Sequence, residues 1–185
     1  MRSWVIAVAV VVVLSLGSWL LKQVFRPVPA SATAGEPELS QEQQQRLSVL
    51  QQQLARDSTN LVAVLELANL YYDIGRFAEA VPLYQRYLAA DPGQAEVRID
   101  YAYALFASGQ QAAGIRELRR VLERFPDHPI ALFNLGVLLA QSGDLQGARQ
   151  SFEELIRLHP ALPLAERAQQ ALRTLDSLQA SSTKP

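Results

Sequence analysis

The sequence predicts an all-α fold, a solenoid of stacked helical hairpins, from three observations. Segments 61–94, 95–128 and 129–162 can be laid over one another at a constant offset of 34 residues. At that offset the glycines coincide at Gly75, Gly109 and Gly143, and the prolines coincide at Pro92, Pro126 and Pro160. A glycine permits the turn between two helices, and a proline ends the second helix because its ring cannot continue the hydrogen-bonding pattern. Each segment is therefore expected to form two amphipathic helices joined by a short turn.

Each unit resembles the tetratricopeptide repeat (TPR), whose pattern is W-x2-L-G-x2-Y, then A-x3-F, then P. The third unit matches that pattern at Leu132, Leu135, Gly136, Leu139, Gly143, Leu145, Ala148, Phe152 and Pro160. Arg98 stands where a large apolar residue is usual, and Gly114 stands where alanine is usual, so local packing should differ there. The resemblance implies a TPR α-solenoid with a concave face lined mainly by the first helix of each unit.

Capping helices are expected on both sides of the three units. Residues 40–56 have Ser40 as N-cap, Glu42 in the first turn, and leucines on one face at Leu47, Leu50 and Leu54. We interpret this segment as an N-terminal cap, and a coiled-coil contact between chains through its glutamines is the alternative. Residues 163–179 carry apolar side chains at helical spacing, at Leu164, Ala168, Leu172 and Leu175, and should close the array with a solvated outer face. Residues 40–179 thus form one repeat domain, and residues 180–185 are expected to be a disordered tail.

The chain begins with an uncharged run from Trp4 to Leu21, between Arg2 and Lys22. At about 1.5 Å per residue a helix of this length spans about 27 Å, close to the hydrocarbon thickness of a bilayer. Residues 1–22 are therefore expected to form a single transmembrane anchor, followed by a flexible linker at 23–39. The alternative is a cleaved signal peptide, because Ala30-Ser31-Ala32 offers a cleavage site. The flanking positive charges are balanced, so an extracytoplasmic (periplasmic) repeat domain is a prior expectation rather than a deduction.

Composition and motifs argue against several function classes. A net charge of −1 with interspersed signs disfavours nucleic acid as a partner, and the absence of cysteine excludes disulfides and thiolate metal sites. The sequence has no nucleophile motif, phosphate-binding loop or metal-ligand spacing. We therefore predict no catalytic residues, no metal and no cofactor, and we do not expect the protein to be an enzyme. His128 and His159 are interpreted as structural. A basic row at Arg116, Arg119, Arg120 and Arg124 is either a solvated outer face or a contact for an acidic partner.

A peptide-binding groove on the concave face remains as the candidate site. The positions that the resemblance assigns to this face include Leu65, Asn69, Tyr72, Ile99, Tyr103, Phe106, Ile130, Phe133 and Val137. This apolar and aromatic lining suits an amphipathic helix or an extended peptide, unless the protein's own helices cover it. Related repeats that grip a chaperone's C-terminal carboxylate have basic and amide residues at set positions of this face. Of those residues only Asn69 matches; the others are replaced by Leu65, Asp100, Ile130 and Asn134, which disfavours that function.

A narrower resemblance lies in the segments 100–105 and 128–132. With the membrane-proximal N-terminus, they resemble the repeat domain of bacterial c-type cytochrome maturation proteins, which work with a haem lyase. That resemblance implies a membrane-anchored scaffold that binds an apocytochrome c helix during cytochrome c maturation. The alternative is a structural assembly subunit of a membrane or cell-envelope complex, whose groove a neighbouring subunit fills permanently.

Overall fold

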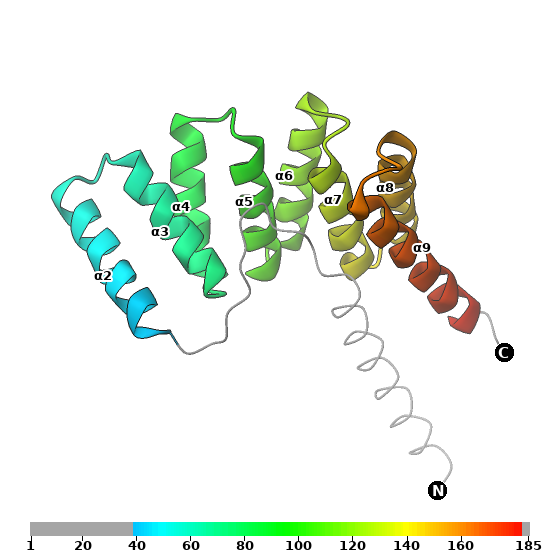
Figure 1. Cartoon of the computed structure of the whole chain (residues 1–185), viewed down its shortest axis with the longest axis horizontal. Helices are drawn as coiled ribbons and strands as arrows, with labels where there is room; N and C mark the ends of the chain where they lie inside the picture. The colour runs from blue at the N-terminus through cyan, green and yellow to red at the C-terminus, as the bar shows by residue number, and fades with distance from the viewer. Residues whose placement is uncertain (1–38, 183–185) are drawn as a thin grey trace, which may run out of the picture.

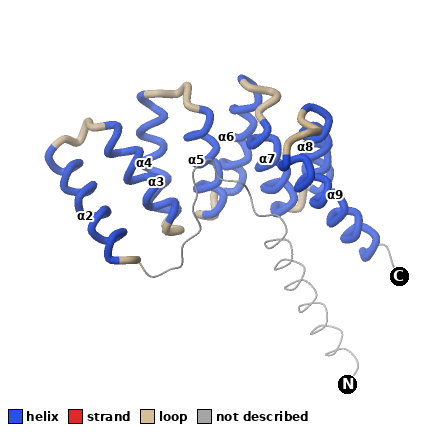
Figure 2. The backbone as a smooth tube through the Cα atoms, viewed as in Figure 1, coloured by secondary structure: helices blue, strands red, loops and turns tan. Residues whose placement is uncertain are grey.

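The computed structural model describes residues 39–182, with side chains described for residues 39–180. In these residues eight helices follow one another and no strand occurs (Figures 1 and 2). The helices are α2 (Gln41–Arg56), α3 (Leu61–Asp73), α4 (Phe77–Ala90), α5 (Ala95–Ala107), α6 (Gln111–Arg124), α7 (Pro129–Ser142), α8 (Leu145–Leu158) and α9 (Pro163–Ser182). Figure 1 shows them side by side in chain order, which confirms the predicted all-helical solenoid.

Helices α3 to α8 form three hairpins, and each hairpin turns at a glycine. The φ angles are +74° at Gly75, +93° at Gly109 and +92° at Gly143. Side chains other than glycine rarely adopt this left-handed region because their Cβ meets the backbone. The glycine series therefore encodes the turns, as the sequence predicts.

The hairpins stack so that their first helices form one layer and their second helices the other. Helix α5 contacts α7, and α7 contacts α9, whereas within residues 39–182 no contact of that extent joins α4 to α6 or α6 to α8. The layer of first helices is therefore the more crowded, concave side of the array. We call the side formed by α3, α5 and α7 the inner face.

Two glycines allow close approach of the helices within a hairpin. A Cβ built on Gly136 in α7 would lie 2.6 Å from the ring of Phe152 in α8. A Cβ on Gly114 in α6 would overlap the carbonyl oxygen of Ala102 in α5. Gly114, which departs from the usual alanine, thus matches an unusually tight contact between α5 and α6.

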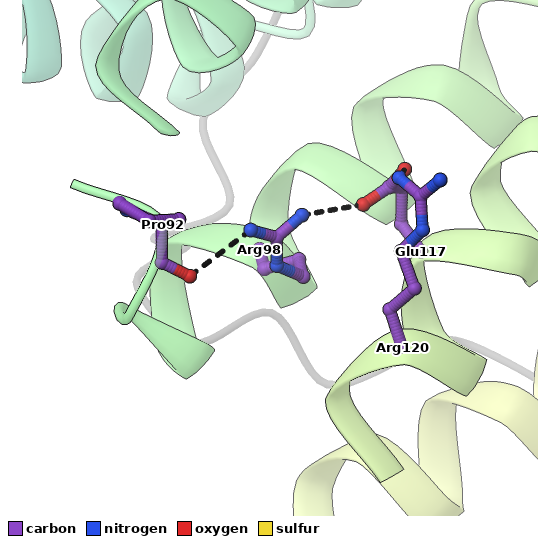
Figure 3. Close-up of polar contacts among 4 residues, drawn as sticks. All are labelled: Pro92, Arg98, Glu117 and Arg120. Carbon is purple, nitrogen blue, oxygen red and sulfur yellow. Dashed lines mark hydrogen bonds and ion pairs between the residues drawn. The ribbon is translucent and has the colours of Figure 1, made fainter. Parts of the chain in front are cut away.

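Arg98, the other departure, makes an ion pair in place of an apolar contact (Figure 3). Its Nη1 atom donates to Glu117 Oε2 at 2.7 Å, and its Nη2 atom donates to the carbonyl oxygen of Pro92 at 3.0 Å. Arg120 donates to the other carboxylate oxygen of Glu117 at 2.5 Å. The guanidinium of Arg98, on α5, thus links the end of the first unit to α5 and, through Glu117, to α6.

The cap helices pack on the ends of the array. The Ser40 hydroxyl accepts a hydrogen bond from the backbone N–H of Gln43, and the Gln43 side-chain oxygen accepts one from the backbone N–H of Ser40, so the predicted N-cap is confirmed. Leu50 is buried on α3, with Leu47 and Leu54 packed beside it.

At the other end, α9 packs against α8 and α7. It continues to Ser182, so residues 180–182 are helical rather than part of a disordered tail. Arg149 of α8 donates to Asp176 at 2.5 Å and to Gln179 at 3.4 Å, and these bonds hold the last turns of α9 against the array.

None of the helices between residues 39 and 182 has the length and apolar character needed to cross a membrane. The anchor predicted at 1–22 and the linker predicted at 23–39 lie outside the described residues, apart from Leu39.

Candidate peptide-binding face

The structure divides the nine predicted groove residues into two groups. Those in the core are Tyr72, Ile99, Phe106, Phe133 and Val137. Those that remain half-buried are Leu65, Asn69, Tyr103 and Ile130. The side chains of the first group are buried in the structure, and their contact with a partner stays a prediction.

Helix α9 explains the burial in the third unit. The guanidinium of Arg167 on α9 lies 4.8 Å from the centre of the Phe133 ring. Val137 shares one hydrophobic cluster with Ala168, Ala171 and Leu175 of α9. The small alanines let α9 approach α7 closely, so the cap helix occupies the space that a groove would need there.

The inner face is more accessible in the first unit. Val62 exposes 68% of its surface, and Glu66 is also exposed. They lie on α3 with the half-buried Leu65 and Asn69. The spacing of Val62, Leu65 and Asn69 places them along one stripe of the helix. Val62 is not among the nine residues selected from the sequence, because a sequence pattern does not show which neighbouring helices leave a side chain exposed.

An aromatic cluster joins α3, α4 and α5 beneath this face. The Tyr72 ring centre lies 5.4 Å from that of Phe77, 5.6 Å from that of Tyr103 and 6.3 Å from that of Tyr84. Phe77 and Tyr103 lie 5.4 Å apart in an edge-to-face arrangement. Such pairs add to the stability gained from apolar burial. Tyr72 and Tyr103, both predicted groove residues, thus bridge the first and second units.

The tyrosine hydroxyls in this cluster differ in their hydrogen bonding. The hydroxyl of Tyr84 donates to Asn69 Oδ1 at 2.9 Å. The hydroxyl of Tyr72 is buried without a hydrogen-bond partner in the described part of the chain. Burial raises the pKa of Tyr72 and of Tyr84 well above the usual value, and the charges of Asp100 and Asp73 raise both further. Both carboxylates therefore act on the two tyrosine hydroxyls.

The two histidines and part of the basic row contact neighbouring residues. His128 caps α7 by accepting from the N–H of Ala131 at 3.3 Å, and its Nε2 lies 3.1 Å from Glu96 Oε1. His159 bonds to the carbonyl oxygen of Asp127. In the basic row Arg116 and Arg119 are exposed, whereas Arg120 pairs with Glu117 and Arg124 stacks 5.5 Å from the Phe125 ring. These contacts give the two histidines structural roles.

Over residues 39–182 no group of three or more His, Asp or Glu side chains is placed to hold a metal ion.

Two family models, both described as tetratricopeptide repeat, match the chain. One matches residues 61–104 and the other matches residues 102–163. Together they cover the three units from the start of α3 to the start of α9.

Curated relatives match the same region. The chain is 33% identical over 97 residues to the Protein CTR9 homolog of Arabidopsis thaliana, a match that covers 52% of this chain and 9% of that protein. It is 34% identical over 97 residues to the Probable biofilm formation methyltransferase WspC of Pseudomonas putida, covering 52% of this chain and 22% of that protein. The chain thus spans less than a quarter of either relative, and the similarity concerns the repeats.

Solved structures share the fold. The crystal structure of MamA aligns with a TM-score of 0.58 at 20% identity, covering 75% of this chain and 90% of that one. The first TPR of Spaghetti (RPAP3) bound to HSP90 peptide SRMEEVD aligns with a TM-score of 0.58 at 22% identity, covering 67% of this chain and 96% of that one. At these identities the likeness establishes the helical array alone.

Proposed function

Because the chain belongs to the tetratricopeptide-repeat family, we propose that it is a scaffold that binds a segment of another protein along the inner face. The observation that carries this proposal is the exposed stripe on α3. Val62 is exposed and Leu65 half-buried, so both retain apolar surface that a partner could remove from water. Asn69 offers an amide beside them. Tyr103 and Ile130 continue the half-buried surface onto α5 and α7.

The partner best matched to this stripe is an amphipathic helix. Apolar side chains at helical spacing would contact Val62 and Leu65, and polar groups at the edge would meet Asn69 and Tyr103. The buried aromatic cluster below gives the stripe a rigid base, which reduces the conformational entropy lost on binding.

A carboxylate-terminated peptide is a poor match to the same face. The RPAP3 domain was solved with an HSP90 peptide. In this chain, by contrast, Asp100 and Glu66 carry negative charge on the inner helices, and a bound carboxylate would meet repulsion. We therefore propose a partner that does not present a terminal carboxylate here.

At a finer level we propose an apocytochrome c helix as the partner, with the anchor at 1–22 holding the repeat domain on the extracytoplasmic side. The similarity of segments 100–105 and 128–132 to cytochrome c maturation proteins supports the partner, and the uncharged run Trp4–Leu21 supports the anchor. Mass spectrometry of the mature N-terminus tests the anchor. A membrane-bound chain that retains residues 1–22 supports it, and a chain beginning near Thr33 would overturn it in favour of a cleaved signal peptide.

A structural assembly subunit is the second candidate. Two large apolar side chains at the N-terminal end, Val49 and Val62, are exposed, and a permanent neighbour would cover them. Obligate co-purification with one complex supports this candidate, whereas reversible binding of a free helix supports the scaffold.

The scaffold is tested by titrating the full chain, in detergent, with a synthetic amphipathic helix. Val62→Asp places a charge on exposed inner surface without disturbing the core, and the helix should bind at least about tenfold more weakly. Arg119→Asp is the matched control, because Arg119 is exposed on α6 in the other layer. Equal loss in both variants, or loss only in the control, would contradict binding on the inner face.

A further inference from the structure

Among the second helices of the three units, only α6 carries a net charge. It contains four arginines and two glutamates, which gives the helix a net charge of +2. Helix α4 has one arginine and one glutamate, and α8 has two of each, so both are neutral. The four arginines of α6 are the basic row, Arg116, Arg119, Arg120 and Arg124.

The arginines of the basic row crowd one another on an exposed stripe. All four are exposed, and they follow one another at spacings of three or four residues, which makes them neighbours on the helix surface. Like charges at this spacing destabilise a helix. Arg116, Arg119 and Arg124 form no ion pair within residues 39–180. An external anion would therefore relieve their repulsion.

The two acids of α6 do not neutralise the row. The carboxylate of Glu117 is shared between two guanidiniums, since Arg98 donates to one oxygen at 2.7 Å and Arg120 to the other at 2.5 Å (Figure 3). Glu123 is exposed and offsets one further charge. The row thus keeps an excess of positive charge that faces solvent.

The shape of the array presents this charge to a flat surface. The first helices approach one another, as α5 does α7, whereas the second helices spread apart, so the layer of second helices is convex. Helix α6 is the middle helix of that layer, and a flat surface meets the middle of a convex face first. Within residues 39–180 the large apolar side chains that are exposed are Val49, Val62 and Leu162. None of them lies on α6, so the row lacks the apolar anchors that a bound peptide would need.

The expected anchor would keep such a surface within reach. Residues 23–39, extended at about 3.1 Å per residue, would span about 50 Å between the uncharged run Trp4–Leu21 and α2. Docking of a tethered domain is intramolecular and needs only a weak attraction. Each arginine near an anionic bilayer strengthens binding by about fivefold.

We propose that the basic row docks the repeat domain on anionic lipid headgroups of the bilayer that holds the anchor. The inference rests on the anchor of the proposed function and adds an orientation to it. The guanidiniums donate paired hydrogen bonds to lipid phosphates. With the second helices on the bilayer, the inner face points away from it, and Val62 stays open to a protein segment.

Energy transfer in nanodiscs tests the orientation. The chain has no cysteine, so one introduced cysteine carries a donor dye at a chosen position. Ala112→Cys labels exposed surface of α6, and Val62→Cys labels the inner face. The full chain is assembled into nanodiscs that carry a headgroup acceptor. Their lipid is phosphatidylcholine alone or an equal mixture with phosphatidylglycerol. Transfer from position 112 should be higher in the anionic nanodiscs, transfer from position 62 should not rise, and about 1 M salt should remove the difference.

Matched variants assign the docking to the row. Arg116→Gln/Arg119→Gln removes two exposed charges without an ion pair, and the ratio of docked to undocked domain should fall about 25-fold. Arg46→Gln/Arg173→Gln removes two exposed charges from the cap helices and should leave the transfer unchanged. Binding of a helix on the inner face is measured in detergent, without a bilayer, so Arg119→Asp remains a control for that separate function.

The outcomes separate the docking from the anchor. If nanodiscs of neither composition retain the chain, the anchor is wrong and the docking falls with it. If the chain is retained but transfer from position 112 is the same in both lipids, the anchor stands and the docking is wrong. Equal loss of transfer in the two double variants also contradicts docking through the row. If Arg116→Gln/Arg119→Gln weakens binding of a glutamate-rich synthetic helix but leaves the transfer unchanged, the row binds an acidic protein segment and the bilayer is the wrong partner.

Discussion

Arg98 forms an ion pair with Glu117, and its Nη1 atom lies 2.7 Å from Glu117 Oε2. Repeats of this kind usually place a large apolar side chain at the position of Arg98. Both side chains are mostly withdrawn from water, with 18% and 10% exposure. The pair connects α5 with α6, and the bond from Arg98 to the Pro92 carbonyl connects both to the end of the first unit. A polar contact therefore defines the junction between the first two units.

The first prediction concerns this pair. Glu117→Ala leaves the guanidinium of Arg98 without its carboxylate and should lower the free energy of unfolding by about 3 kcal/mol. Urea denaturation measures the loss. Glu123→Ala, on the exposed side of the same helix, is the control and should change stability by less than about 0.5 kcal/mol. The double variant Arg98→Leu/Glu117→Leu should recover most of the loss, because apolar packing replaces the buried charges. A double variant less stable than Glu117→Ala would contradict this reading.

The second prediction compares two buried tyrosines. Tyr84→Phe removes the donor to Asn69 and should cost about 1 kcal/mol. Tyr72→Phe removes a hydroxyl that has no partner in residues 39–182, so stability should stay within about 0.5 kcal/mol or rise. Thermal and urea unfolding measure the loss of stability in both variants. A larger loss in Tyr72→Phe than in Tyr84→Phe would show that the Tyr72 hydroxyl is bonded in solution.

The third prediction concerns alkaline pH. Burial, with the charges of Asp100 and Asp73, raises the pKa of Tyr72 and Tyr84 in the folded state. Because the folded pKa exceeds the unfolded value of about 10, their contribution to stability is complete below about pH 10 and is lost as the pH rises further. The free energy of unfolding should fall steeply above about pH 10, and less steeply in the double variant Tyr72→Phe/Tyr84→Phe. An identical slope in the two proteins would place the alkaline transition elsewhere.

The fourth prediction concerns α9. Leu175 is fully buried against the third unit, so Leu175→Ala should cost about 3 kcal/mol, whereas Arg173→Ala on the exposed side of the helix should cost little. Differential scanning calorimetry should show one lowered transition, because α9 shares a core with α7 and α8. A separate low-temperature transition for α9 would contradict its integration into that core.

Much of the fold follows from local chemistry that the sequence displays. Gly75, Gly109 and Gly143 require positive φ, and each unit's proline follows the end of a helix, so hairpin positions can be read directly. Burial of the groove residues could not be read in this way. Phe133 and Val137 occupy positions of the same kind as Leu65 and Asn69, but α9 covers only the third unit.

The sequence also does not show which side chains on different helices contact one another. Arg98 is visible as a departure from the repeat, but its partner Glu117 lies on the next helix and has no motif of its own. The aromatic cluster draws Tyr72, Tyr84 and Tyr103 from three helices, and only the packing of those helices brings the rings together.

Site-specific photo-crosslinking shows directly whether the inner face binds a protein segment. A photoreactive amino acid replaces Val62 on α3 or Arg119 on α6, both exposed, in the full chain mixed with the synthetic amphipathic helix. We expect a crosslink from position 62 that an excess of unlabelled helix removes, and none from position 119. A competed crosslink from position 119 with none from position 62 would place the binding surface on the layer of second helices and contradict binding on the inner face.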